Sequence, residues 1–229
     1  MKQGLALLEK QYRGWSLGNK TGSSKKAVEK SPQPFITISR DFSGGKGLIA
    51  KSVAAELGFR VYDKELIEMI ASSAQVKNLL VESLDQRYLG QIEEFFENLF
   101  NVEHVNETTY MKHLSRVILS LITKGKAIIV GRGANFIAPF SWGLQVRIIS
   151  PLSERVERLA ADSKMSIAQA KRIVAKEDNK RALFIRKNFG RDINDPLAYD
   201  LVINAGEFDV PQITKIIVRA FKEKIKESK

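Results

Sequence analysis

The sequence predicts an α/β protein in which helices cover both faces of a parallel β-sheet. From residue 35 onward, short apolar segments rich in β-branched residues alternate with segments of helical periodicity, a pattern typical of parallel sheets. A glycine-rich turn joins the first of these strands to the first helix. Hydrophobic residues make up 44% of the 229 residues, close to the globular average of about 45–50%, so the chain can bury a core.

Residues 1–34 are expected to form an N-terminal extension with a flexible linker. Four apolar residues of the first half have helical spacing: Leu5, Leu8, Tyr12 and Trp15. Residues 18–34 are rich in Gly, Ser, Lys and Pro, a composition typical of linkers. Both a solvated extension and a helix that docks on a partner agree with this pattern.

The main domain, residues 35–229, begins with a β-branched run, Phe35–Ser39, which predicts a buried strand. The turn Ser43–Gly47 follows, and apolar residues then recur at helical spacing until Gly58, which is expected to end the helix. Phe59–Tyr62 is the second predicted strand. Asp63 stands where it would cap the next helix.

A helical segment is expected to separate the second strand from the third. Residues 78–124 carry apolar residues at helical spacing, including a phenylalanine stripe that we assign to the core. A helix over about residues 107–124 is expected to end at Gly125. The apolar run Ala127–Val130 then predicts the third strand.

The C-terminal third opens with a predicted strand, Gln145–Ser150, and Ser150–Pro151 is a favourable start for the next helix. Ser166 and Gln169 have capping-box spacing, which predicts the start of a long basic helix that ends near Asn188. Two elements complete the order: the strand Tyr199–Asn204 and a helix from near Asp209.

The segment Phe35–Lys51 has the order that a phosphate-binding loop (P-loop) requires: a buried strand, a glycine turn with a lysine, and a helix. Backbone N–H groups at a helix N-terminus bind anions, and glycines allow close approach. The full motif G-x-x-x-x-G-K-[ST] has a glycine where Arg40 stands, and neither Gly47 nor Leu48 supplies the hydroxyl that normally binds Mg²⁺. A plain glycine-rich turn is the alternative.

Charge and composition narrow the classes of function. The formal net charge is +11, and residues 1–34 hold seven basic but only two acidic residues, so the expected ligands are polyanions. The absence of cysteine excludes disulfides, thiolate zinc sites and cysteine nucleophiles. We find no nucleic-acid-binding motif and expect no nucleic-acid partner. The apolar runs are far shorter than the roughly 20 residues of a membrane span, so we expect a soluble, cytoplasmic protein without a membrane partner.

Several segments together resemble the cytidylate kinase-like family of P-loop nucleoside monophosphate kinases. They are Ile36–Gly58, Val61–Ala71, Ala127–Ile137, Glu154–Arg155, Lys176–Gly190 and Asp195–Ala205. The resemblance implies a P-loop NTPase-type parallel sheet, a helical monophosphate-binding insertion over about residues 63–124 and a mobile basic lid over about residues 176–195. It also implies phosphoryl transfer from ATP to CMP or dCMP, giving CDP or dCDP, with Mg²⁺ as cofactor and nucleotides as substrates.

The resemblance also implies roles for individual residues. The donor-phosphate loop would comprise Ser43, Gly44, Gly45, Lys46 and Gly47. Lys46, Arg132, Arg181 and Arg186 would be catalytic, and Asp63, Arg132 and Arg191 would bind the monophosphate. Asp41 and Asp63 are the candidate Mg²⁺ ligands.

Three positions depart from the pattern of true cytidylate kinases, which have Gly where Arg40 stands, Thr where Leu48 stands and Asp where Gly133 stands. The pair Ser39–Arg40 is itself usual in the cytidylate kinase-like branch. The Asp helps to read cytosine, so the acceptor base and sugar stay open. A catalytically weak or inactive nucleotide-binding regulator is the alternative function.

Overall fold

A computed structural model describes residues 34–43, 47–63, 109–138 and 143–226. The predicted extension, most of the predicted insertion and Lys46 lie outside these ranges. All described residues belong to the second of the two units into which the chain divides, Pro32–Lys229.

The described residues form a parallel sheet of five strands in the order β2-β3-β1-β4-β5. The strands are β1 Phe35–Arg40, β2 Arg60–Tyr62, β3 Ala127–Val130, β4 Gly143–Ile149 and β5 Leu201–Asn204. Each neighbouring pair is parallel. The α/β prediction is therefore confirmed.

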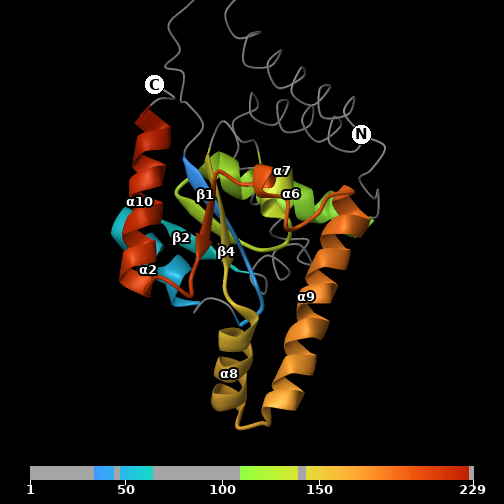
Figure 1. Cartoon of the computed structure of the whole chain (residues 1–229). Coiled ribbons are helices and arrows are strands. Elements are labelled where there is room, and N and C mark those ends of the chain that lie inside the picture. Colours follow the sequence, from blue (N-terminus) through green and yellow to red (C-terminus); the bar gives the residue numbers. More distant parts are fainter. Residues whose placement is uncertain (1–33, 44–46, 64–108, 139–142, 227–229) are drawn as a thin grey trace, which may run out of the picture. The chain divides into compact units, whose positions relative to one another are not determined.

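Helices cover both faces of this sheet (Figure 1). They are α2 Leu48–Leu57, α6 Thr109–Lys124, the short α7 Ala134–Ile137, α8 Leu152–Ser163, α9 Ile167–Phe189 and α10 Val210–Lys226. A 3₁₀ turn, η2 Pro196–Ala198, precedes β5. None of the helices in the described part of the chain is long and apolar enough to span a bilayer.

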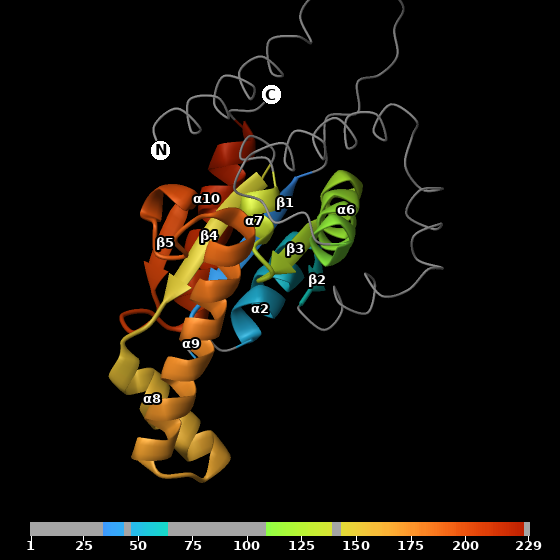
Figure 2. The ribbon, with the colours of Figure 1, turned by 90° about the vertical axis from the view of Figure 1, so that its right-hand side faces the viewer.

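Alternation along the strands divides the core into two layers. Ile36 and Ile38 point to the face covered by α2 and α10, where they pack with residues such as Val53 and Ile217. Phe35 points to the opposite face, which is covered by α6, α7 and the end of α9. Figure 2 shows α6 beside β3 on that face. The three central strands, β1, β3 and β4, are buried on both sides, which explains their continuous apolar runs.

Helices α8 and α9 form an antiparallel hairpin with a small core of its own (Figure 2). Val156 and Ala160 of α8 pack against Ala170 and Val174 of α9, and Phe42 from the loop after β1 packs against this cluster. The region expected to be the lid thus begins within α9, and the hairpin contacts the first loop of the sheet.

The predicted helix ends agree with the structure at several positions. Ser166 and Gln169 form the predicted capping box at the start of α9. Gly58 ends α2 in the left-handed region with φ 68°. One expectation is wrong: Pro151 rather than Ser150 occupies the cap position of α8, without a side-chain cap. The backbone N–H of Ser150 instead donates to the Asp41 carboxylate at 3.2 Å.

Candidate phosphate-binding site

The candidate site lies at the carboxyl edge of the sheet, where the loops of parallel strands converge. The loop after β1 contains Asp41, Phe42 and Ser43, and the turn after β3 contains Arg132. The two strands are direct neighbours. The Gly131 N–H donates to the carbonyl of Ile38 at 3.0 Å, so both turns start side by side at one edge.

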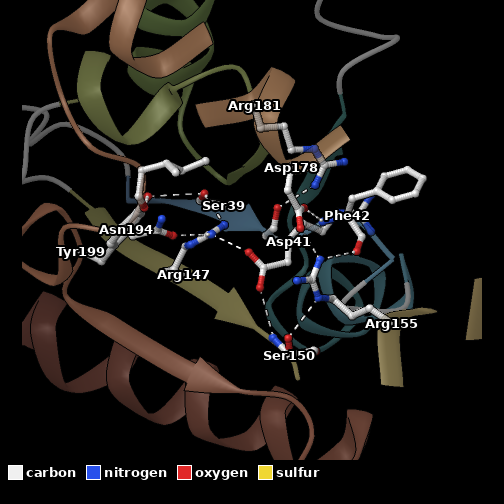
Figure 3. A network of polar contacts seen from close by, with 12 residues as sticks. Ser39, Asp41, Phe42, Arg147, Ser150, Arg155, Asp178, Arg181, Asn194 and Tyr199 are labelled. Carbon is white, nitrogen blue, oxygen red and sulfur yellow. Dashed lines mark hydrogen bonds and ion pairs between the residues drawn. The ribbon is translucent and has the colours of Figure 1, made fainter. Parts of the chain in front are cut away.

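A buried ion pair fixes the first residue of the loop after β1 (Figure 3). Asp41 accepts from Arg147 of β4 at 2.5 Å, and the Arg147 residue is 4% exposed. Arg147 also donates to Ser39 at 3.3 Å and to Asn194 at 3.4 Å. With Ser150 N–H on its other oxygen, the Asp41 carboxylate is engaged by donors at both oxygens.

A second ion pair ties the α8–α9 hairpin to the same loop. Arg155 of α8 donates to Asp178 of α9 at 2.5 Å, to the carbonyl of Phe42 at 3.2 Å and to the carbonyl of Ser150 at 3.0 Å. The other oxygen of Asp178 accepts the Phe42 N–H at 3.1 Å. Both backbone polar groups of Phe42 are therefore bonded to the hairpin (Figure 3).

Two further arginines of the hairpin reach this loop but donate to carbonyl oxygens rather than to carboxylates. Arg158 bonds the carbonyl of Ser43 at 2.8 Å. Arg181 bonds the carbonyl of Arg40 at 2.8 Å, and its guanidinium lies 5.4 Å from the ring centre of Phe42. Burial first, and then the charge of Arg40, lower the pKa of Arg181. The positive charge at the loop therefore exceeds what Asp41 and Asp178 neutralise.

The turn after β3 holds Arg132 in an unusual backbone conformation. Gly131, Arg132 and Gly133 have φ values of 78°, 55° and 66°, and the Ala134 N–H closes the turn on the Gly131 carbonyl at 3.1 Å. The left-handed region costs a residue with a side chain about 1–2 kcal/mol. Such strain is often found at functional sites, where surrounding structure maintains it.

Gly133 lies directly against an aromatic ring of α9. A Cβ at this position would come within 2.4 Å of Cε2 and 2.8 Å of Cζ of Phe189. A side chain here therefore requires Phe189 to move in addition to the positive φ. This contact gives a physical reason why the aspartate of true cytidylate kinases has no counterpart in this chain.

Replacing Gly133 by alanine is expected to lower the free energy of unfolding by about 2–4 kcal/mol, because backbone strain and the collision add. Gly58→Ala is the matched control, since Gly58 has φ +68° but nothing within 4 Å of the added Cβ; it should cost about 1–2 kcal/mol. Urea denaturation measures both. Equal losses for the two variants would contradict the collision, and Phe189→Leu should recover part of the Gly133→Ala loss.

The remaining predicted residues are placed as follows. Asp63 is exposed directly after β2, and Arg186 is exposed in the last turn of α9. Arg191 is half-buried just beyond that helix. Ser43 has φ 56° and Gly47 is the exposed cap residue of α2. Gly44, Gly45 and Lys46 lie outside the described residues.

The sequence did not predict a functional role for four residues of this site: Arg147, Arg155, Arg158 and Asp178. The sequence could have indicated some of these residues. Arg155 and Arg158 stand three residues apart and therefore share a helix face, and the same holds for Asp178 and Arg181. Nothing local indicates that Arg147 of a buried strand meets Asp41.

Tyr199 anchors the segment between α9 and β5 to the site's edge. Its hydroxyl donates to the carbonyl of Ile193 at 2.8 Å, and burial raises the pKa of this phenol. A raised folded-state pKa means that its contribution to stability is complete below the unfolded pKa of about 10 and is lost as pH rises through the folded pKa.

Tyr199→Phe should therefore be about 1 kcal/mol less stable than the wild type at pH 7, because the hydrogen bond to Ile193 is lost. Above about pH 10 this gap should narrow, since only the wild type loses stability through ionisation of this group. Urea denaturation of both proteins between pH 7 and pH 11 measures the gap. A gap that widened with pH would contradict this account.

Comparison with known proteins supports the resemblance expected from the sequence. A family model described as "Cytidylate kinase-like family" matches residues 35–207. A cytidylate kinase of Ignicoccus hospitalis is 22% identical over 184 residues, which are 80% of this chain and 96% of that protein. A cytidylate kinase of Saccharolobus islandicus is 28% identical over 124 residues, 53% of this chain and 66% of that protein.

Two further matches extend this comparison. A uronate isomerase of Corynebacterium glutamicum is 35% identical over 115 residues, which are 48% of this chain but only 21% of that protein. The crystal structure of an uncharacterized protein from Eubacterium ventriosum has a TM-score of 0.66 at 20% identity, covering 83% of this chain and 99% of that one. The structural match shows a shared fold.

Proposed function

This chain belongs to the cytidylate kinase-like family, and from that premise we propose that it transfers a phosphoryl group from ATP to a nucleoside monophosphate. Family membership supports nucleotide kinase activity in general. CMP and dCMP are the first acceptors to test, because curated relatives of the chain are cytidylate kinases. Which base the protein accepts is also part of the proposal. The aspartate that helps to read cytosine in true cytidylate kinases has no counterpart here, because a side chain at position 133 would collide with Phe189.

One observation carries this proposal: Arg158 and Arg181 of the α8–α9 hairpin converge on the loop after β1 without a carboxylate partner for either hydrogen bond. Phosphoryl transfer requires positive charge around a polyphosphate and in-line positioning, and little covalent chemistry from the protein. Guanidinium groups bonded to Arg40 and Ser43, next to a glycine-rich sequence between a strand and a helix, meet this requirement.

In the proposed mechanism, Lys46 and the backbone of Ser43–Gly47 bind the donor phosphates. Arg158 and Arg181 neutralise charge that develops on the transferred group, as preorganised donors do in low-dielectric sites. Arg132 binds the acceptor phosphate through its planar fork of donors. Arg155 and Asp178 act indirectly, by holding the loop and the hairpin together.

The outer residues of the proposed site complete these roles. Arg186 is proposed to act as a catalytic arginine of the lid. Arg191 and Asp63 are proposed to bind the monophosphate. Because they are not buried, we expect them to contribute when the substrates are bound.

The described part of the site offers guanidinium groups for phosphates, but it offers no group of metal ligands. Within the described ranges no three His, Cys, Asp or Glu residues group where they would hold a metal. Asp41 is already engaged by Arg147 and Ser150, and Leu48 supplies no hydroxyl. Asp41 and Asp63 therefore both stay candidate ligands in this proposal. Bound Mg²⁺ would neutralise charge on the phosphates, and no step above depends on its position.

A steady-state assay tests the proposal: purified protein, Mg²⁺, ATP and a panel of nucleoside monophosphates, with nucleotides separated by chromatography. ADP and one nucleoside diphosphate should appear in equal amounts and only when both substrates are present. Lys46→Ala should lower kcat/KM at least a hundredfold, because the charge at the donor phosphates is lost. Lys215→Ala on the exposed side of α10 is the control. Nucleotide binding without turnover would instead favour the regulatory alternative.

A further inference from the structure

Phe184 of α9 lies next to Arg132, although 52 positions separate them in the sequence. The guanidinium carbon of Arg132 is 5.6 Å from the centre of the Phe184 ring. At this distance the face of an aromatic ring attracts a cation. The ring therefore holds the far end of a side chain whose backbone is already fixed by the left-handed turn after β3.

The Phe184 ring is itself held by an aromatic cluster that consists of Phe136, Phe184 and Phe189. Phe189 lies edge-on to Phe184 with centroids 6.3 Å apart, and it stacks on Phe136 of α7 at 5.4 Å. Phe189 also contacts Gly133, the residue next to Arg132. The cluster thus connects the end of α9 to the turn after β3.

The same helix contacts the loop after β1 one turn earlier. Asp178, Arg181 and Phe184 stand three residues apart, so they lie along one side of α9. Asp178 and Arg181 bond the loop after β1, whereas Phe184 contacts Arg132. One helix therefore contacts both the start of the loop after β1 and Arg132.

We propose that Phe184 is a positioning residue: it orients the Arg132 guanidinium toward the phosphate of the acceptor and so links the α8–α9 hairpin to acceptor binding. This inference rests on the proposed function, in which Arg132 binds the acceptor phosphate. It predicts that changes at Phe184 affect the acceptor and act only through Arg132.

Titration calorimetry with CMP and, separately, with ATP tests this inference and does not depend on turnover. Phe184→Leu should raise the Kd for CMP roughly tenfold and change the Kd for ATP less than about twofold. Phe184→Tyr retains an aromatic face and should bind CMP like the wild type. Leu183→Ala is the matched control, because Leu183 is 54% exposed on the same helix. Thermal unfolding identifies any variant that is not folded, and Phe184→Met then replaces Phe184→Leu.

A double-mutant cycle separates this inference from the proposed function. In an Arg132→Ala background, Phe184→Leu should cause no further loss of CMP affinity. If Arg132→Ala weakens CMP binding but Phe184→Leu does not, or if Phe184→Leu acts equally in both backgrounds, the positioning role is refuted. If the wild type binds another monophosphate of the panel but not CMP, the cycle is measured with that monophosphate. If Arg132→Ala leaves the affinity for the monophosphate unchanged, or the wild type binds none of the panel, the proposed acceptor site fails and the inference fails with it.

Discussion

Arg132→Ala is expected to lower kcat/KM for the monophosphate by roughly a thousandfold, the lower end of the about 10³–10⁵ measured for arginine fingers in phosphoryl transfer. In the proposed site, the strained turn after β3 holds Arg132 at φ 55° next to the loop after β1, where its guanidinium would bind the acceptor phosphate. An alanine has neither the charge nor the bidentate geometry that a phosphate needs. The KM for ATP should change less than about twofold, because the proposed donor loop, Ser43–Gly47, does not include Arg132.

Arg219→Ala is the control for this prediction. It removes the same charge from an exposed position of α10, where Arg219 forms an i,i+4 pair with Glu223, and it should leave both substrates unaffected. Arg132→Lys should recover only part of the loss, because lysine lacks the planar fork. Equal effects of Arg132→Ala on ATP and on the monophosphate would mean that Arg132 does not select the acceptor.

Asp41→Ala is expected to lower the free energy of unfolding by about 3–5 kcal/mol, because it leaves a buried charge without its partner. Arg147 is 4% exposed. Among the ion pairs described for this site, its carboxylate partner is Asp41. The substitution also removes the acceptor of the Ser150 N–H. Urea denaturation at neutral pH measures the loss.

Two further variants show whether the isolated charge causes this loss. Asp41→Ala combined with Arg147→Met should be more stable than Asp41→Ala alone, since replacing both members of a buried pair is often nearly neutral. Glu177→Gln breaks an exposed pair with Lys180 on α9 and should leave stability unchanged within error. A double variant no more stable than Asp41→Ala would contradict the buried-charge explanation.

The sheet and its helices could be predicted from the sequence because local patterns determine them. The buried strand after Pro34, the stop at Gly58 and the capping box at Ser166 are each encoded within a few residues, and each agrees with the structure. The start of α8 differs by one position, and the Ser150 N–H at this start bonds Asp41, which is far away in the sequence. Local preference alone does not determine such a contact.

The part of the site that could not be predicted depends on contacts between distant segments. Asp41 and Arg147 are separated by 106 positions and Phe42 and Asp178 by 136. Sequence patterns give the spacing of arginines on α8 and α9, but not the loop that they contact. The reason for glycine at position 133 likewise becomes visible only when Phe189 is placed against it.

The most direct test of the account follows the transferred phosphate itself. The protein is incubated with ATP labelled at the γ-phosphate, Mg²⁺ and unlabelled CMP, and the nucleotides are separated. The label should appear in the β-phosphate of CDP, at a rate that Lys46→Ala and Arg132→Ala each reduce at least a hundredfold. Label released only as inorganic phosphate, or transfer that persists in both variants, would contradict it.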